Sequence, residues 1–572
     1  MSMIFAVLFS QLNVIVSVAG VAVGVDFGAI STRVAVVMRD GGLPYLHPNA
    51  LGARSMPSLI GFGDRGERLV GERADMAACI SCVFHGARDL LGLPATAMTR
   101  AWGYAFFKYN LTTVPERRTP LLVSLTGKNF LPEEVAAMLL KEAVKDFAGE
   151  AAGKAGGPRV AVAVPPQWTQ RRRQALIDAC NIAGLNLTSI ISDHAAAALQ
   201  YGVEQPLRKG ERRRTVLIVG LGATSGYAAI VRYSAYTAKV NPGGRGRPSA
   251  AVSVPYIAVK RIAWEEGVGG WHMDALLAKH LAGQAEAGGA CSAAPSPAGG
   301  CIGPRAMSRL LAAARKAREV LSVNTEAAAQ VTDLVPGRDF STTVTRAQFE
   351  DLAREIVERA AKPAARVLRS YPAGIDAIEL VGGASRTPLF QALLRQAVSA
   401  ATGRDLPLGR HVNTDEAVAL GAALRAANVT AAVKDGRAPP RAALQDISPF
   451  TLRASAGAAG SAELVRAGGA IPASRTVSIA NVTRDLEITI DTLIGTAEPS
   501  PEESVAFKVR GVAEAAARAA GKRGKGRGGR RRALRGRRAQ AQCQQERDRG
   551  GRQGVRAQWE ELQGSPGGAA AG

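Results

Sequence analysis

Three glycine-containing turns are the parts of this sequence best suited to chemistry. Gly28-Ala29-Ile30-Ser31, Gly222-Ala223-Thr224-Ser225 and Gly382-Gly383-Ala384 each follow a run of apolar residues. Phosphate oxygens need several backbone N–H groups pointing one way, and only small side chains let the chain approach that closely. Each turn taken alone would be an ordinary turn, but the three together favour a nucleotide as ligand.

Two of these turns belong to an internal repeat. Residues 21 to 37 and residues 215 to 231 both contain a strand, a turn and a second strand, and aligning Gly28 with Gly222 also pairs Ser31 with Ser225. Two copies of a phosphate-sized turn, about 190 residues apart, suggest a two-lobed protein with its ligand between the lobes. The alternative is coincidence among small residues, which a sequence rich in Ala and Gly makes easier.

Strands and helices alternate around the turns, which predicts a mixed α/β core. Residues 160 to 164 and 377 to 381 are apolar strands, and residues 305 to 323 and 348 to 370 are amphipathic helices. Beyond about Ala438 the pattern changes to short alternating runs, which is typical of a β-rich module. From Arg518 the composition is Gly, Arg, Ala and Gln, which cannot build a core.

Composition excludes several classes of protein. The 572 residues are 47% apolar, and their spread along the chain excludes collagen, coiled coils and wholly disordered proteins. The net charge is +24, of which +11 falls in residues 518 to 572. Six scattered cysteines are too few for a disulfide scaffold. His272 beside Asp274 has no nucleophile partner, and we expect it at the surface.

The N-terminus predicts a signal peptide over residues 1–19. No charged side chain precedes Asp26, and Ser17-Val18-Ala19 supplies the small residues that signal peptidase reads. The alternative is a buried first strand. Where about one glycosylation sequon is expected by chance, four occur, which favours the secretory route. They begin at Asn110, Asn186, Asn428 and Asn481.

Several segments, in their order, resemble the seventy-kilodalton heat-shock family. The turn at residues 26 to 31 resembles its first phosphate loop, residues 163 to 203 its linking region, and residues 379 to 394 its adenosine loop. The resemblance covers about residues 20 to 430 and extends in part to about 512. Within the family it is greatest to the large endoplasmic-reticulum branch of the hypoxia-up-regulated type. The segments that carry it are residues 305 to 331, 339 to 352 and 409 to 424.

The resemblance implies a domain plan and a site. Residues 20–437 would form a two-lobed, actin-like (ribonuclease H-like) ATPase domain, residues 445–512 a partial β-sandwich substrate module, and residues 513–572 a disordered basic tail. ATP and Mg²⁺ are the implied cofactors, with Asp26 and Asp193 as catalytic acids and Asp26 on the metal side. The implied cofactor-binding residues are Gly28, Ala29, Ile30, Gly222, Ala223, Thr224, Gly269, Gly270, Arg315, Arg318, Ser322, Gly382, Gly383, Ala384, Arg386 and Asp415.

Three positions depart from the family pattern. Gly220 and Tyr227 stand where the family carries aspartates, and Asp75 stands at the position of its catalytic lysine. Losing a cation and two carboxylates removes electrostatic stabilisation on which phosphoryl transfer depends. We therefore expect ATP binding with weak hydrolysis.

Three functions remain open from the sequence. The first is a chaperone of the endoplasmic-reticulum lumen that binds unfolded clients weakly and acts as nucleotide exchange factor for the resident lumenal seventy-kilodalton chaperone. The second is a cytosolic, ribosome-associated, non-catalytic platform, and the third is a small-molecule kinase of the same fold. We expect no membrane span after signal cleavage. We also expect no specific nucleic-acid partner, although the basic tail could attract RNA by charge alone; a disordered tail or a mistaken reading frame are the alternatives.

Overall fold

The computed structural model describes most of the chain. The described residues are 21–38, 42–63, 65–76, 82–94, 109–115, 119–124, 127–147, 157–241, 250–288, 302–429, 440–456, 460–472, 486–493 and 504–509. The expected signal peptide, the basic tail and the Asn481 sequon lie outside them. Two compact units divide the chain: the first runs to Leu444, and the second contains the residues from Gln445 together with Thr169–Arg171.

The first lobe of the first unit is built on one mixed sheet. Its strand order is β12-β11-β1-β2-β3, with β4 paired to β2. The strands are β1 (Ala22–Phe27), β2 (Ser31–Val37), β3 (Tyr45–His47), β4 (Met56–Pro57), β11 (Arg159–Val164) and β12 (Leu187–Ser192). Two small sheets stand beside it, β6 (Arg68–Val70), β5 (Ile60–Phe62) and β7 (Val83–Phe84), and β10 (Asn129–Phe130), β9 (Thr119–Val123) and β8 (Asn110–Val114).

The second lobe contains a sheet of the same plan. Its strands run in the order β19-β18-β13-β14-β15. They are β13 (Arg214–Leu221), β14 (Ser225–Val240), β15 (Ala250–Glu266), β18 (Ala377–Val381) and β19 (Leu408–Gly409). In each lobe the strand before the glycine turn pairs antiparallel with the strand after it and parallel with a later strand, β1 with β11 and β13 with β18. The internal repeat of the sequence therefore occupies corresponding places in the two sheets.

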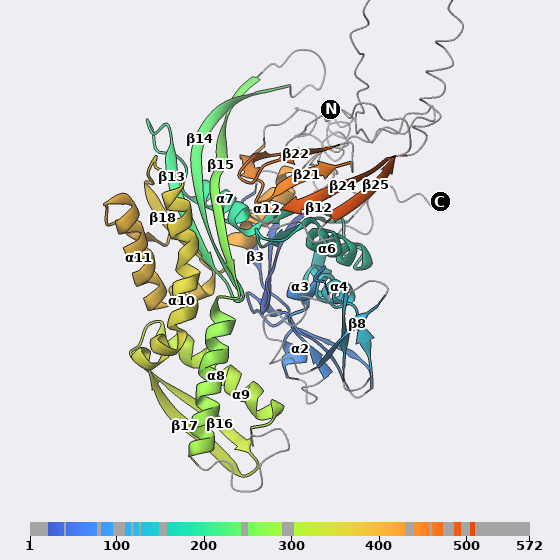
Figure 1. Cartoon of the computed structure of the whole chain (residues 1–572), viewed down its shortest axis with the longest axis vertical. Helices are drawn as coiled ribbons and strands as arrows, with labels where there is room; N and C mark the ends of the chain where they lie inside the picture. Colours follow the sequence, from blue (N-terminus) through green and yellow to red (C-terminus); the bar gives the residue numbers. More distant parts are fainter. Residues whose placement is uncertain are drawn as a thin grey trace, which may run out of the picture. The chain divides into compact units, whose positions relative to one another are not determined.

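Helices cover the sheets, and each lobe has its own apolar core. The first lobe carries α2 (Glu72–Asp75), α3 (Ala87–Leu90), α4 (Pro132–Ala143), α6 (Gln170–Ile182) and α7 (Asp193–Glu204). The second carries α8 (Gly270–Ala287), α9 (Pro304–Leu321), the hairpin β16 (Glu326–Val335) and β17 (Arg338–Thr345), α10 (Arg346–Arg369), the 3-10 turn η4 (Gly383–Arg386) and α11 (Pro388–Thr402). Helices α10 and α11 lie side by side in Figure 1. The core of the second lobe includes Leu217, Leu277, Leu310, Phe349 and Phe390.

The helix α12 (Ala417–Asn428) joins the two lobes. It follows β19 in the chain, yet its alanines pack on β1, β2 and β11 of the first lobe. Two close approaches depend on glycine, since a Cβ on Gly24 would collide with the α12 backbone at Ala423, and a Cβ on Gly421 would collide with the Ala196 carbonyl of α7. This Ala- and Gly-rich packing ties the residues just before α12 to both lobes.

The second unit is made of β-strands. A four-stranded sheet runs in the order β22 (Ser461–Val465), β21 (Thr451–Ser455), β24 (Leu486–Leu493) and β25 (Ser504–Val509). A short pair joins β20 (Ala443–Ile447) to β23 (Ala470–Ile471). Alternating side chains such as those of β24 suit a sheet with one covered face. Among the described residues, no helix combines the length and apolar character that crossing a bilayer requires.

Candidate nucleotide-binding site

A cavity of about 1200 Å³ lies in the first unit, lined from both lobes. All the residues that the sequence assigned to a site line this cavity, except Gly269. We call the part formed by the two repeated turns, Asp26 and Asp193 the phosphate end. We call the part formed by η4, α9 and Asp415 the nucleoside end.

The first glycine turn connects β1 to β2 through Gly28, Ala29 and Ile30. The Gly28 N–H donates to the Asp26 carbonyl at 3.1 Å, and the Ser58 hydroxyl donates to the Gly28 carbonyl at 2.9 Å. A Cβ on Gly28 would collide with the Ser31 carbonyl, so the turn tolerates no larger residue there. These two hydrogen bonds and the close approach of Ser31 fix the conformation of the turn.

The second glycine turn is supported from below by the start of α8. The N–H groups of Gly270 and Trp271 donate to the carbonyls of Gly222 and Ala223, each at 3.0 Å. Gly269 has a φ of 122° and touches this turn so closely that a Cβ would collide with the Gly222 carbonyl. Gly269 therefore supports the turn from outside the cavity, which explains why it is absent from the lining.

The nucleoside end begins at the sharp turn after β18. Gly382 has a φ of 85°, which favours glycine, and its N–H donates to the Thr414 carbonyl at 2.6 Å. The Ser385 hydroxyl donates back to the Gly382 carbonyl at 2.6 Å, and Ala384 is buried. The loop at Gly383 is close to Asp415, whose Oδ1 would lie 3.0 Å from an added Cβ.

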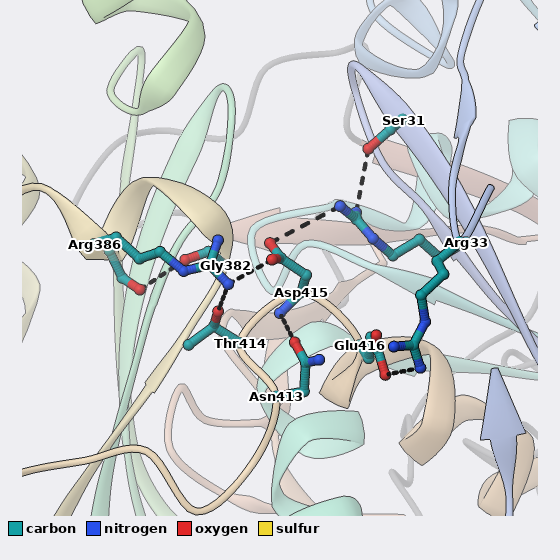
Figure 2. A network of polar contacts seen from close by, with 10 residues as sticks. Ser31, Arg33, Gly382, Arg386, Asn413, Thr414, Asp415 and Glu416 are labelled. Carbon is teal, nitrogen blue, oxygen red and sulfur yellow. Dashed lines mark hydrogen bonds and ion pairs between the residues drawn. The ribbon is translucent and has the colours of Figure 1, made fainter. Parts of the chain in front are cut away.

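Asp415 connects the two lobes at this end, as Figure 2 shows. The Arg386 guanidinium donates to Asp415 Oδ2 and to the Thr414 hydroxyl, each at 2.5 Å. Arg33 of β2 lies 3.9 Å from Asp415 Oδ1 and also donates to the Ser31 hydroxyl at 3.1 Å. These bonds hold the Arg386 guanidinium beside Asp415, and its role as a cofactor-binding residue stays a prediction.

The α9 side of the cavity depends on a buried carboxylate in α8. Asp274 is 0% exposed, and its oxygens accept from Arg318 Nε at 2.5 Å and from Arg315 Nε at 3.4 Å. Ser322 ends α9, with its hydroxyl on the Glu319 carbonyl at 2.6 Å. Sequence reasoning overlooked Asp274 as an anchor. The signal was available, because Asp274 lies on the apolar face of α8 with Trp271, Leu277 and Ala278.

His272 does not occupy the surface position that the sequence suggested. It is partly buried, and its Nδ1 is shielded from solvent. Burial lowers the pKa of His272 to about 4. The physical reason is its place in the first turn of α8, whose backbone packs against the second glycine turn. Asp274 pairs with Arg315 and Arg318 and not with His272.

Two buried carboxylates meet at the phosphate end. Burial raises the pKa of Asp26, which the charges of Arg33 and Arg88 lower in part. Burial and the charge of Asp26 raise the pKa of Asp193 to about 7. Neither acid forms an ion pair with another described residue. A cation placed beside them would offset the cost of burying their charge.

This donor set suits Mg²⁺, which proteins usually hold through one or two carboxylates while phosphate oxygens and waters complete the shell. In the described part of the chain, no cluster of three or more His, Cys, Asp or Glu side chains is arranged to bind a metal alone. The residues therefore fit a metal that arrives with a phosphate ligand. The assignment of Asp26 as its ligand stays a prediction.

Gly220 and Tyr227, both departures from the family pattern, form one structural pair. They face each other across β13 and β14, and a Cβ on Gly220 would collide with the Tyr227 ring. The Tyr227 hydroxyl is buried and makes no hydrogen bond within the described residues. Burial, with the charges of Asp193 and Asp26, raises its pKa well above the usual value. The Tyr227 ring thus occupies the space that a side chain at position 220 would need.

Comparison with known proteins identifies the family of this chain. Residues 22–521 match the family model described as Hsp70 protein. The chain therefore belongs to the Hsp70 protein family, and the resemblance found in the sequence is confirmed. Members of this family in general bind ATP with Mg²⁺.

Three curated relatives illustrate the similarity. Heat shock 70 kDa protein 17 of Arabidopsis thaliana is 32% identical over 399 residues, which are 68% of this chain and 43% of that protein. Chaperone protein dnaK3 of Thermosynechococcus vestitus is 30% identical over 445 residues, 76% of this chain and 58% of the relative. Hypoxia up-regulated protein 1 of Homo sapiens is 30% identical over 443 residues, 75% of this chain and 40% of the relative. The chain thus spans roughly half of the length of each relative.

Proposed function

We propose that the first unit binds ATP in the cavity between the lobes. The observation that carries this proposal is the convergence of three small-residue turns, two from the internal repeat and one after β18, on one cavity of about 1200 Å³. Backbone N–H groups of the repeated turns would receive the phosphates, and Gly382–Ala384 would pass under the ribose and base. Asp26 would hold Mg²⁺ with Asp193 beside it, and a bound Mg²⁺ supplies charge neutralisation of the phosphate oxygens.

Substitution of Gly383 by Trp tests the site. The indole would fill the space above the adenosine loop, so ATP binding measured by calorimetry should be lost. The matched control is Gly283→Trp, because Gly283 is exposed on α8 with no atom within 4 Å of its added Cβ. Unchanged ATP affinity in a folded Gly383→Trp protein would overturn the site assignment.

Slow hydrolysis is the second part of the proposal. Asp75 lines the cavity where the family resemblance expects a lysine, and the Tyr227 ring fills the space beside Gly220. Both changes remove charge that would stabilise phosphoryl transfer. Turnover by purified protein should therefore be far below that of an ordinary Hsp70, and turnover at an ordinary rate would reject this part while leaving ATP binding intact.

We further propose a role in the endoplasmic-reticulum lumen as a chaperone and exchange factor for the resident lumenal Hsp70. The similarity to Hypoxia up-regulated protein 1 and the leader-like N-terminus support the location. A slow ATPase that keeps its two-lobed domain offers a fixed surface for gripping a partner's lobes. Its β-rich second unit would bind unfolded clients weakly, because residues 513–572 contain too few large apolar side chains to pack over it.

Nucleotide release from the lumenal partner tests the exchange role. We expect release of labelled ADP to accelerate when this protein is added, both with the full chain and with a variant lacking residues 513–572. No acceleration with either protein rejects the role, and acceleration only with the full chain assigns it to the tail.

The leader and the glycosylation sites decide the compartment. Mature protein beginning at Gly20 with endoglycosidase-sensitive mass supports the lumen, whereas an intact N-terminus without glycans supports the cytosolic platform. Asn110 is the exposed acceptor among the described sequons. The Asn428 amide instead binds the chain, accepting from the Arg441 N–H at 3.0 Å and donating to the Ala442 carbonyl at 3.2 Å. We therefore expect Asn110→Gln, and not Asn428→Gln, to remove glycan mass.

A further inference from the structure

The phosphate end contains a buried cation that the sequence did not single out. Arg88 lies on α3 of the first lobe, lines the cavity, and has only 10% of its side chain exposed. Its Nε and Nη2 donate to Asp89 Oδ1 at 2.8 and 2.6 Å. Its Nη2 also donates to the Thr224 hydroxyl at 3.0 Å, so one guanidinium connects the first lobe to the second glycine turn.

Burial of this arginine needs an explanation beyond the Asp89 pair. An arginine remains charged in any protein environment, and its planar fork of donors matches phosphate oxygens. Buried apolar residues flank this segment, with Val83 and Phe84 before Arg88 and Leu90 and Leu91 after it. Asp89 is equally buried, with 10% of its side chain exposed, but it does not line the cavity, whereas Arg88 does, so the arginine is the member of the pair that a ligand in the cavity can reach.

The surrounding charges also call for a cation. Asp26 and Asp193 bring two buried carboxylates together at this end, and Asp75 is a further acid in the lining of the cavity. Arg33, the other arginine beside a repeated turn, is engaged with Ser31 and Asp415 toward the nucleoside end. Arg88 lies close enough to Asp26 and Asp193 to lower the pKa of each. Without a cation, a polyphosphate beside Asp26 and Asp193 would meet net repulsion.

We propose that Arg88 binds the terminal phosphates of the nucleotide and makes this cavity prefer nucleoside triphosphates over the nucleoside. This inference rests on the proposed ATP binding. A phosphate oxygen would take the place of the Thr224 hydroxyl as acceptor on Nη2 while Asp89 continues to orient Nε. Arg88 thereby supplies, from α3, the cationic contact that Asp75 cannot supply from α2. It acts as a binding and specificity residue of the site.

The test compares ATP and adenosine on the full-length protein. We expect Arg88→Gln to weaken ATP binding by about 10- to 100-fold, because a charged hydrogen bond to phosphate is lost, while adenosine binding stays within about twofold. Arg88→Lys should recover part of the ATP affinity, since a lysine keeps the charge without the fork.

Arg214→Gln is the matched control. Arg214 is equally buried, with 12% of its side chain exposed, and it pairs with Glu211 at 2.5 Å outside the cavity. It should leave the ratio of ATP to adenosine affinity unchanged. Adenosine binding by Arg88→Gln also reports that its site is folded.

Each outcome is decisive. If wild-type protein binds neither ATP nor adenosine, the proposed function fails. If wild type prefers ATP and Arg88→Gln keeps that preference, or if Arg88→Gln loses ATP and adenosine affinity equally while remaining folded in a thermal melt, the inference about Arg88 fails and ATP binding stands.

Discussion

The nucleoside end and the phosphate end of the cavity handle charge in opposite ways. At the nucleoside end Asp274 meets Arg318 at 2.5 Å and Asp415 meets Arg386 at 2.5 Å, so the carboxylates are balanced within the protein. At the phosphate end Asp26 and Asp193 are buried without an ion pair to a described residue, and burial raises the pKa of both. The carboxylates of the nucleoside end are thus paired with arginines, whereas Asp26 and Asp193 have no ion-pair partner among the described residues.

This difference separates binding from turnover. If ATP binds as proposed, the paired charges of the nucleoside end would hold the base and ribose independently of changes beside the phosphates. By the family resemblance, Gly220, Tyr227 and Asp75 stand at the positions of two carboxylates and a lysine, and such exchanges would reduce the charge available for the proposed hydrolysis. Nucleotide affinity and hydrolysis should consequently respond to different substitutions.

The largest effect should come from breaking the balanced end at Asp274. Asp274→Asn leaves Arg318, whose side chain is 13% exposed, without its counter-charge. Removing one partner of a buried ion pair costs about 3 kcal/mol of unfolding free energy. Denaturant titration measures the loss. Asp351→Asn, which removes the carboxylate facing Arg354 at the surface of α10, serves as control and should leave stability unchanged. Equal effects of the two substitutions would contradict the balanced-end description.

A somewhat smaller effect is expected at Gly382, which contacts the second glycine turn at Leu221 and Gly222. Gly382→Ala places a Cβ against the Leu221 carbonyl at a φ of 85°, so the loop must move, and ATP should bind about tenfold more weakly. Gly374→Ala is the matched control, because its φ is 77° and no atom lies within 4 Å of its added Cβ. Both variants bear the strain of a left-handed residue, yet only Gly382→Ala should change ATP affinity in calorimetry.

Much of the site could be predicted from the sequence because its turns are local. The glycine positions follow from the strands before them, and the repeat places two turns at corresponding strands, β1 and β13. Asp274 and Arg88 could not be placed in this way. Their partners, Arg318 and Thr224, lie 44 and 136 residues away, so only the folded structure brings them together. An acidic residue on an apolar helix face was the one visible hint for Asp274.

Gly220 and Tyr227 show a different limit of sequence reasoning. Taken one at a time, each residue is only a position where the family resemblance expects an acid. In the structure the two residues lie opposite each other on β13 and β14, and this pairing follows from the strand register, which the sequence alone does not give. A double-mutant cycle tests the fit. Gly220→Ala should destabilise by about 2 kcal/mol through overpacking against the ring, and the same change in a Tyr227→Ala background should cost much less. Additive losses of unfolding free energy would show that positions 220 and 227 are not coupled and would contradict the fit.

The smallest expected effect is a pH response beside the second glycine turn. Burial lowers the pKa of His272 to about 4, below its usual value of 6.5. Between these values the unfolded chain binds a proton that the folded chain does not, so the contribution of neutral His272 is complete above pH 6.5 and is lost as the pH falls toward 4. Near pH 5.5 the loss should be about 1 kcal/mol. His272→Gln should remove this part of the slope without changing stability at pH 8 by a similar amount, and denaturant midpoints at pH 8, 6.5 and 5.5 measure it. If wild type and His272→Gln lose stability in parallel on acidification, then His272 titrates normally and the packing of α8 against the turn is looser than described.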